Sequence, residues 1–162
     1  MNTYCSEPIQ LQLYRKKTHG DLSTYYLPEE QRAFTASPVK ALSACKLDQE
    51  RTPIVITRGN DPVGFFVLHY GGNIKPYSEN PDAILLRAFS IDYHHQRKGY
   101  ARSALRQLPD FVRHHFPFIK EIVLAVNFNN LTAKSLYEKM GYKEMGIREG
   151  KKGLQYLMHL TL

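Results

Sequence analysis

At the centre of the chain stands a polar loop, Gln96-Arg97-Lys98-Gly99-Tyr100-Ala101, between an apolar segment and an amphipathic one. The apolar segment, Ala83 to Ile91, has the near-continuous hydrophobic run of a strand that is covered on both faces. After the loop, small and apolar residues recur at helical spacing, at Ala101, Ala104, Leu105, Leu108 and Val112. The sequence therefore predicts a strand, a polar turn and a helix, in that order.

The predicted turn has the features of a pyrophosphate site. A helix start offers unpaired backbone N–H groups and a partial positive charge, which together favour an anion. Gly99 lets the backbone approach a bound group, while Arg97 and Lys98 add two cations at the rim. Taken alone, the loop is equally consistent with an ordinary strand-to-helix turn. It has neither the Gly-Lys-Ser/Thr ending of a P-loop nor the glycine spacing of a dinucleotide fingerprint.

A second strand and a second helix follow further along the chain. Glu121 to Val126 reads as a buried strand, followed by Asn127-Phe128-Asn129-Asn130. One face of the next helix is marked by Ala133, Leu136, Tyr137 and Met140, and Gly141 ends it as a C-terminal cap.

Together these segments resemble the GCN5-related N-acetyltransferase (GNAT) superfamily. Its acetyl-CoA motif appears as Gln96-x-x-Gly99-x-Ala101, and its later motif as Asn130-x-x-Ala133-x-x-Leu136-Tyr137-Glu138-Lys139-x-Gly141-Tyr142. The resemblance covers residues 83–162 closely and the N-terminal half only in pattern. It implies one domain, residues 1–162, of α/β (α+β) class, with a mixed, mostly antiparallel central sheet flanked by helices. It also implies transfer of an acetyl group from acetyl-CoA to a primary amine of a small molecule or peptide.

The resemblance assigns roles to individual residues. Backbone groups of Phe89, Ser90 and Ile91 would pair with the pantetheine arm, and one N–H there would face the thioester oxygen. The pyrophosphate would be held by the loop residues Gln96, Arg97, Lys98, Gly99, Tyr100 and Ala101. Asn130 matches the family's cofactor-side asparagine, and Tyr137 matches the general acid that protonates the CoA sulfur. The alternative for Tyr137 is a packed aromatic side chain on an amphipathic helix.

The general base is not evident from the sequence. Many members of the family use a carboxylate on the central strand, whereas the ionisable residue on this strand is Arg87. Asp92, Glu79 and Asp82 are the alternatives, and none is preferred. If Arg87 faces the acceptor, the acceptor is expected to carry a carboxylate or phosphate beside its amine.

Charge leaves a second class of function open. The 162 residues carry a net charge of +7, with 12 Lys/Arg against 6 Asp/Glu from Asp92 onward. A basic half suits the phosphates of CoA, and it also suits nucleic acid. The basic residues lack the aromatic interleaving of a nucleic-acid platform, so nucleic acid is not the expected partner. The alternative function is a non-catalytic module on the same fold that binds CoA, a basic partner or nucleic acid.

Cysteine and histidine usage predicts no metal site. Cys5 and Cys45 are isolated, and the doublets His94-His95 and His114-His115 lack the helical spacing of paired ligands. His94 and His95 could still lie at the CoA rim. With no apolar leader or membrane-length run, the expected location is a reducing cytoplasm.

The remaining segments complete the predicted domain. Apolar and polar residues alternate over residues 9–13, which predicts a half-buried strand. Helix starts at Pro28 and Pro38 suggest an arm over the acceptor side. Residues 54–70 are expected to form a hairpin. The polar loop 71–82 is expected to contribute to the acceptor site. Pro109 should kink or break its helix. The final antiparallel pair, which ends in Leu157-Met158-His159-Leu160, would present an edge to a partner in a homodimer.

Overall fold

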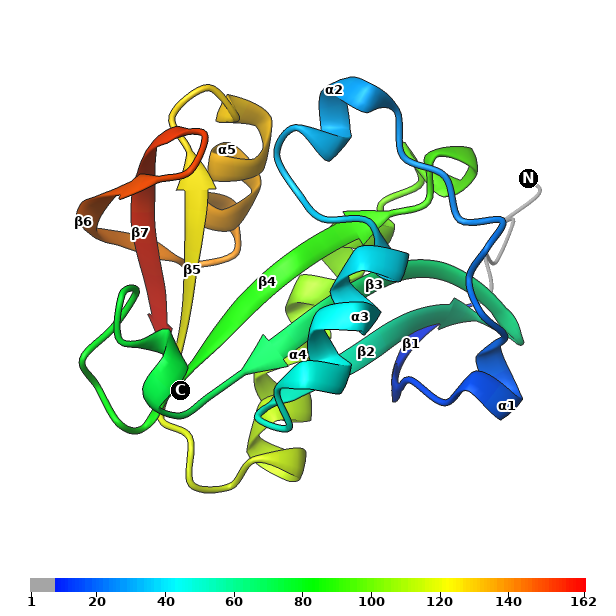
Figure 1. Cartoon of the computed structure of the whole chain (residues 1–162), viewed down its shortest axis with the longest axis horizontal. Helices are drawn as coiled ribbons and strands as arrows, with labels where there is room; N and C mark the ends of the chain where they lie inside the picture. The colour runs from blue at the N-terminus through cyan, green and yellow to red at the C-terminus, as the bar shows by residue number, and fades with distance from the viewer. Residues whose placement is uncertain (1–7) are drawn as a thin grey trace, which may run out of the picture.

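The computed structural model describes residues 8–162, which form one seven-stranded sheet. The strands lie in the order β1-β2-β3-β4-β5-β7-β6 (Figure 1). Their bounds are β1 Ile9–Leu13, β2 Arg51–Arg58, β3 Asp61–His69, β4 Ala83–Ile91, β5 Glu121–Asn127, β6 Lys143–Gly150 and β7 Gly153–Thr161. Neighbouring strands are antiparallel except β4 and β5, which are parallel. The prediction of a mixed, mostly antiparallel sheet flanked by helices is confirmed. Cys5 lies outside the described residues.

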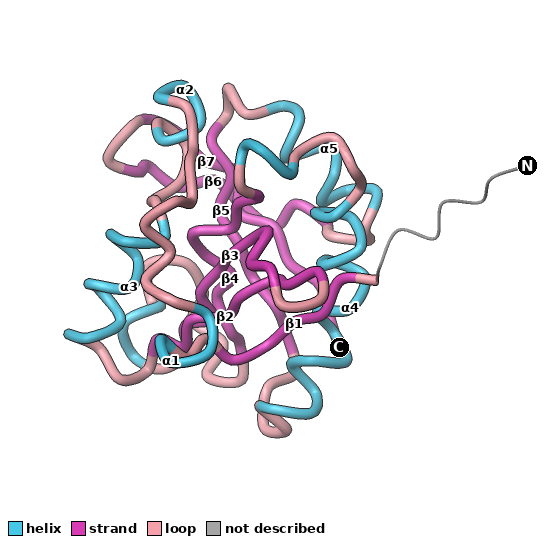
Figure 2. Tube along the Cα trace, turned by 90° about the vertical axis from the view of Figure 1, so that its right-hand side faces the viewer, coloured by secondary structure: helices cyan, strands magenta, loops and turns pink. Residues whose placement is uncertain are grey.

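Helices cover both faces of the sheet. Their bounds are α1 Lys16–His19, α2 Glu29–Arg32, α3 Pro38–Leu47, α4 Tyr100–His115 and α5 Leu131–Lys139, with 3-10 turns η1 Gly72–Ile74 and η2 Tyr93–His95. Seen along the sheet, α3 lies on one side, and α4 and α5 lie on the other (Figure 2). Across residues 8–162, the longest and most apolar helices still fall short of what a membrane crossing requires.

The core explains why the central strands have unbroken apolar runs. Phe65 and Phe66 are adjacent on β3 and both fully buried, but they point to opposite faces. Phe66 packs in the larger cluster with Leu105 and Leu108 of α4, whereas Phe65 packs with Ala41 of α3. Because side chains alternate along a strand, burial on both faces needs a hydrophobic residue at nearly every position.

The helix after the polar loop has the predicted buried face. Ala104, Leu105, Leu108 and Val112 are each at most 2% exposed. The predicted break at Pro109 does not occur, because α4 is one helix from Tyr100 to His115 with Pro109 inside it. Burial of the apolar face on both sides of the proline stabilises the helix against the backbone hydrogen bond that proline cannot donate.

The N-terminal helices begin where the sequence predicts. Ser37 caps α3, its hydroxyl accepting from the Lys40 N–H at 3.4 Å, and Pro38 follows at the first helical position. The helix that begins after Pro28 is the single turn α2. The segment between α2 and α3 runs close to the end of β4 (Figure 1).

The C-terminal pair forms as predicted and lies at one end of the sheet. β7 pairs with β5 from Gln155 to Thr161, so the segment Leu157–Leu160 lies inside the sheet. The edge strand is β6, where Met145 is 39% and Ile147 60% exposed. The pair therefore presents a free edge, as predicted, and this edge belongs to β6 because β7 is paired on both sides.

Candidate active site

Strands β4 and β5 separate halfway along their length. They pair only from Ala83 to Leu85, opposite Glu121 to Val123. Beyond this point Ala88 has a positive φ of 54°, and the register between β3 and β4 shifts. Such a bulge bends a strand and increases its twist. The upper halves of β4 and β5 therefore diverge, and they leave a gap in the hydrogen-bonded pairing of the sheet.

The loop before α4 has the geometry of an anion site. Gly99 has φ +80°, Arg97 has φ 63°, and both lie in the left-handed region. Gly99 is the N-cap of α4 and gives the helix no side-chain cap, so the first backbone N–H groups stay available. Apart from Gly99 itself and its two chain neighbours, none of the described residues has an atom within 4 Å of a Cβ placed on Gly99. This open space beside free N–H groups fits the pyrophosphate of CoA.

Several residues of the predicted cofactor site use their side chains to hold the loop. The Gln96 amide donates to the carbonyl of Ile91 at 2.9 Å and exchanges hydrogen bonds with Gln31 at 2.7 and 3.1 Å. The Tyr100 hydroxyl accepts from Arg58 at 2.9 Å. Gln96 and Tyr100 can therefore meet a cofactor mainly through their backbone, whereas the side chains of Arg97 and Lys98 are exposed.

The end of β4 carries a polar contact that the sequence does not indicate. The Ser90 hydroxyl lies 2.8 Å from the hydroxyl of Tyr25, and burial raises the pKa of Tyr25 above its ordinary value. Phe89, beside Ser90, packs against Phe66 with ring centroids 5.8 Å apart. The two partners are 65 residues apart and no pattern joins them, so only the fold reveals that Tyr25 reaches this site.

Helix α5 begins directly after β5 and carries the other two predicted residues. Asn130 is its N-cap, and its side-chain oxygen accepts from the Ala133 N–H at 3.3 Å. Tyr137 is 9% exposed, and its ring lies 5.7 Å from that of Tyr142. Burial raises the pKa of Tyr137, so its hydroxyl keeps its proton at neutral pH. The residue is thus packed in the core with its hydroxyl protonated.

The cap at Asn130 allows a stability test. Asn130→Ala should lower the free energy of unfolding by about 1 kcal/mol, the usual cost of losing an N-cap side chain. Urea unfolding checks this value against Ser135→Ala, an exposed position in the same helix that should change stability by less than about 0.5 kcal/mol. Equal stability of Asn130→Ala and the unmodified protein would contradict a capping role.

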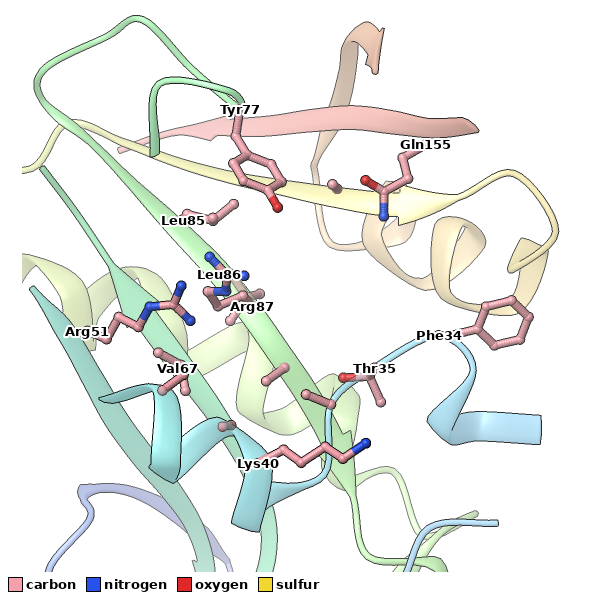
Figure 3. Close-up of a pocket in the computed structure, with 15 residues that line it drawn as sticks. Phe34, Thr35, Lys40, Arg51, Val67, Tyr77, Leu85, Leu86, Arg87 and Gln155 are labelled. Carbon is pink, nitrogen blue, oxygen red and sulfur yellow. The ribbon is translucent and has the colours of Figure 1, made fainter. Parts of the chain in front are cut away.

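A pocket opens on the face of the sheet opposite α4. Its volume is about 240 Å³, and it lies between α3, β4, β5 and the loop before β4. Ala88 and Ala125 line it at the level of the β4/β5 gap. Arg51, Arg87 and Tyr77 point into it, and Gln155 of β7 lies at its rim (Figure 3). A larger hollow on the other side of α3, lined by residues such as Tyr14 and Pro53, contains none of the predicted site residues.

The pocket joins residues that the sequence treated separately. Tyr77 comes from the polar loop 71–82 and Lys40 from α3, so both segments expected near the acceptor line the pocket. Arg87 lines it as well. The proposed bases do not: Asp92 accepts from the His94 N–H at 3.2 Å, and Asp82 lies 4.0 Å from Lys120. Glu79 is outside the lining too. Within residues 8–162, no group of three or more His, Cys, Asp or Glu residues could hold a metal ion.

Comparisons with known proteins agree with this geometry. The family model described as "Acetyltransferase (GNAT) family" matches residues 19–142. An uncharacterized N-acetyltransferase of Bacillus subtilis (strain 168), YbbJ, is 39% identical over 156 residues, covering 95% of this chain and 98% of its own length. Aminoglycoside acetyltransferase AAC(6')-Ib, solved with coenzyme A and kanamycin, superposes with a TM-score of 0.77 at 18% identity, covering 94% of each chain. Spermidine N-acetyltransferase from Vibrio cholerae, solved with CoA and spermine, has a TM-score of 0.71 at 15% identity, covering 94% of this chain and 95% of its own. The chain therefore belongs to the acetyltransferase (GNAT) family.

Proposed function

We propose that this chain is an N-acetyltransferase that moves the acetyl group of acetyl-CoA onto the primary amine of a small molecule or peptide. The observation that carries the proposal is that an anion site at the start of α4 and a pocket on the opposite face both adjoin the unpaired segments of β4 and β5. A donor held from one face can present its thioester to an amine that enters from the other. Family membership supports acetyl-CoA as the donor, and the amines in the solved relatives support an amine acceptor.

The donor would be held mainly by backbone groups. The first N–H groups at the start of α4, from Gly99 to Ala101, would bind the pyrophosphate in the open space beside Gly99, and Arg97 and Lys98 would add positive charge. Phe89, Ser90 and Ile91 would pair with the pantetheine arm along β4. Asn130, which begins α5, would contact the same arm from the β5 side.

The reaction needs one bond to form and one to break. The neutral amine nitrogen attacks the thioester carbonyl carbon, and a tetrahedral intermediate forms whose oxyanion a backbone N–H at the end of β4 stabilises. The carbon–sulfur bond then breaks, the Tyr137 hydroxyl gives its proton to the CoA sulfur, and the attacking nitrogen loses one proton to solvent. Tyr137 regains its proton from water, and the products are an amide and CoA.

The pocket offers a reason why a strand carboxylate is dispensable. An alkyl ammonium has a pKa near about 10.4 and must lose a proton before it attacks. Neighbouring positive charges favour the neutral form of an amine, and Arg87, Arg51 and Lys40 line this pocket. We propose that the positive charge of the pocket, of which an anion on the acceptor would offset only a part, lowers the pKa of the bound amine, so that water can take its proton.

Thiol release tests the proposed activity. The protein with acetyl-CoA should release CoA when a panel of amino acids, phosphorylated amines, polyamines, aminoglycosides and peptides includes an acceptor. Tight acetyl-CoA binding without thiol release from any amine would favour the non-catalytic CoA-binding module.

We further expect a homodimer in which two copies meet at the free edge of β6. An unpaired strand edge can add a strand from a second chain, and Met145 and Ile147 are exposed there. Sedimentation at high micromolar concentration should show the dimer, and Ile147→Lys should shift it toward monomer. Monomer alone at that concentration would contradict this expectation.

A further inference from the structure

The pocket has a strong excess of positive charge. Lys40, Arg51 and Arg87 line it, and of the described lining residues none is acidic. A fourth cation, Arg148, lies at its rim, with its guanidinium 4.2 Å from the centre of the Tyr77 ring. Arg87 approaches the same ring at 5.8 Å. Both Arg51 and Arg87 extend into the pocket (Figure 3).

The carboxylate of Asp48 lies next to these cations, but it already accepts hydrogen bonds from residues outside the pocket lining. Asp48 accepts from His69 Nε2 at 2.9 Å, from Asn73 at 3.1 Å and from the Glu50 N–H at 3.0 Å. The same carboxylate is 3.6 Å from Arg51 Nε. One engaged carboxylate outside the lining cannot balance the cations that face the cavity.

A hydrogen bond to His69 holds the Arg87 side chain in place. Its guanidinium donates to His69 Nδ1 at 3.2 Å, and His69 is fully buried. Burial, with Arg51 and Arg87 nearby, lowers the pKa of His69, so the ring is neutral. The neutral ring accepts from Arg87 at Nδ1 and donates to Asp48 at Nε2. Asp48 and His69 thus fix Arg87 without covering the face that it turns to the pocket.

Arg51 is compensated only in part, by the Asp48 carboxylate 3.6 Å from its Nε. Its Nε is buried and, within the part of the chain that the structure describes, has no hydrogen-bond partner. Buried donors are nearly always paired, so this N–H without a hydrogen-bond partner is unusual. Arg51 and Arg87 therefore carry more positive charge than Asp48 offsets, and an anion in the pocket would complete the site.

We propose that the acceptor is an anionic amine, whose carboxylate or phosphate is bound by Arg51 and Arg87 while its amine is directed to the β4/β5 gap at Ala88 and Ala125. This inference deepens the proposed acetyl transfer and rests on it. Guanidinium groups match the planar geometry of carboxylate and phosphate oxygens with paired hydrogen bonds. A polycation would meet like charges on every side of the same cavity.

Matched pairs of amines test the proposal directly. L-alanine and L-alaninamide differ in a carboxylate, and phosphoethanolamine and ethanolamine differ in a phosphate; spermidine and kanamycin represent polycations. We expect calorimetry on the CoA-loaded protein to show at least tenfold tighter binding of the anionic member in at least one pair. The pair that shows the difference identifies the anion as carboxylate or phosphate.

Arginine variants then locate the binding site. Arg87→Met should abolish most of the difference within that pair and leave CoA affinity unchanged, while Arg87→Lys should retain part of it. Arg51→Met is a second variant in case Arg87→Met does not fold. The control is Arg113→Met, which removes the same charge from an exposed side chain paired with Asp110 near the end of α4. The control should bind both members like the unmodified protein.

The outcomes separate this inference from the proposed function. Equal or absent binding of the anionic members, or an unchanged preference in both folded pocket variants, overturns the anion site. If spermidine or the neutral amines are acetylated without such a preference, acetyl transfer stands and the anionic acceptor is rejected. If the anions bind through Arg87 but no thiol is released, the anion site stands and the proposed function fails.

Discussion

Tyr137→Phe should lower turnover with acetyl-CoA about 100- to 10,000-fold, which is the usual effect of losing a general acid. The substitution keeps the ring and its packing in the core but removes the O–H that would protonate the CoA thiolate. Burial raises the pKa of this hydroxyl, so the unmodified protein holds the proton over the whole neutral range. Acetyl-CoA affinity and thermal stability should change little, because no apolar volume is lost.

The neighbouring Tyr142 supplies a matched control. It is 2% exposed, packs against Tyr137, and its hydroxyl has no hydrogen-bond partner among residues 8–162. Tyr142→Phe should therefore leave turnover unchanged. The Tyr137→Phe defect should also shrink for an acetyl thioester of a more acidic thiol, which needs no proton to leave. Equal turnover of Tyr137→Phe and Tyr142→Phe at saturating substrate would assign Tyr137 to packing alone.

Gly99→Glu should abolish measurable CoA binding while the protein still folds. The new side chain would enter the open space at the start of α4 and place a carboxylate where the pyrophosphate is expected. Because Gly99 has φ +80°, the substitution also adds backbone strain of about 1 kcal/mol. Calorimetric titration with CoA measures the loss, and a thermal melt confirms that the variant is folded.

A second glycine separates strain from blocking of the site. Gly20 has φ +76°, also has open space around its added Cβ, and lies at the C-terminal end of α1. Because Gly20 has ψ −168°, in a region essentially restricted to glycine, Gly20→Glu should lose at least as much stability as Gly99→Glu but keep full CoA affinity. Unchanged CoA affinity of folded Gly99→Glu would show that the start of α4 does not bind the pyrophosphate.

Those parts of the fold that depend on local pattern were predictable. The bounds of β4 agree with the apolar run from Ala83 to Ile91, because a strand buried on both faces needs that composition. The start of α3 follows from Ser37 and Pro38, which cap a helix by their own chemistry. The helical spacing of the apolar residues on α4 likewise predicts which face is buried.

Those features that depend on contacts between distant segments were not predictable. The pocket is lined by residues from four different elements, and no spacing in the chain relates them: Lys40, Arg51, Arg87 and Gln155. The bulge at Ala88 arises in a segment that reads as a regular strand. Arg87 is an unusual residue for this strand, but the sequence does not show where its side chain points, because that depends on contacts with His69 and Asp48.

The most direct test of amine acetylation is product analysis with acetyl-CoA labelled in the acetyl group. The labelled donor, the protein and each amine of the panel are incubated together, and the acceptors are analysed by mass spectrometry alongside the thiol released. We predict that the label appears on the nitrogen of an acceptor, with one free CoA for each acetylated amine, and that Tyr137→Phe slows both together. If acetyl-CoA binds but the label remains on the donor with every amine, the result would contradict amine acetylation by this protein.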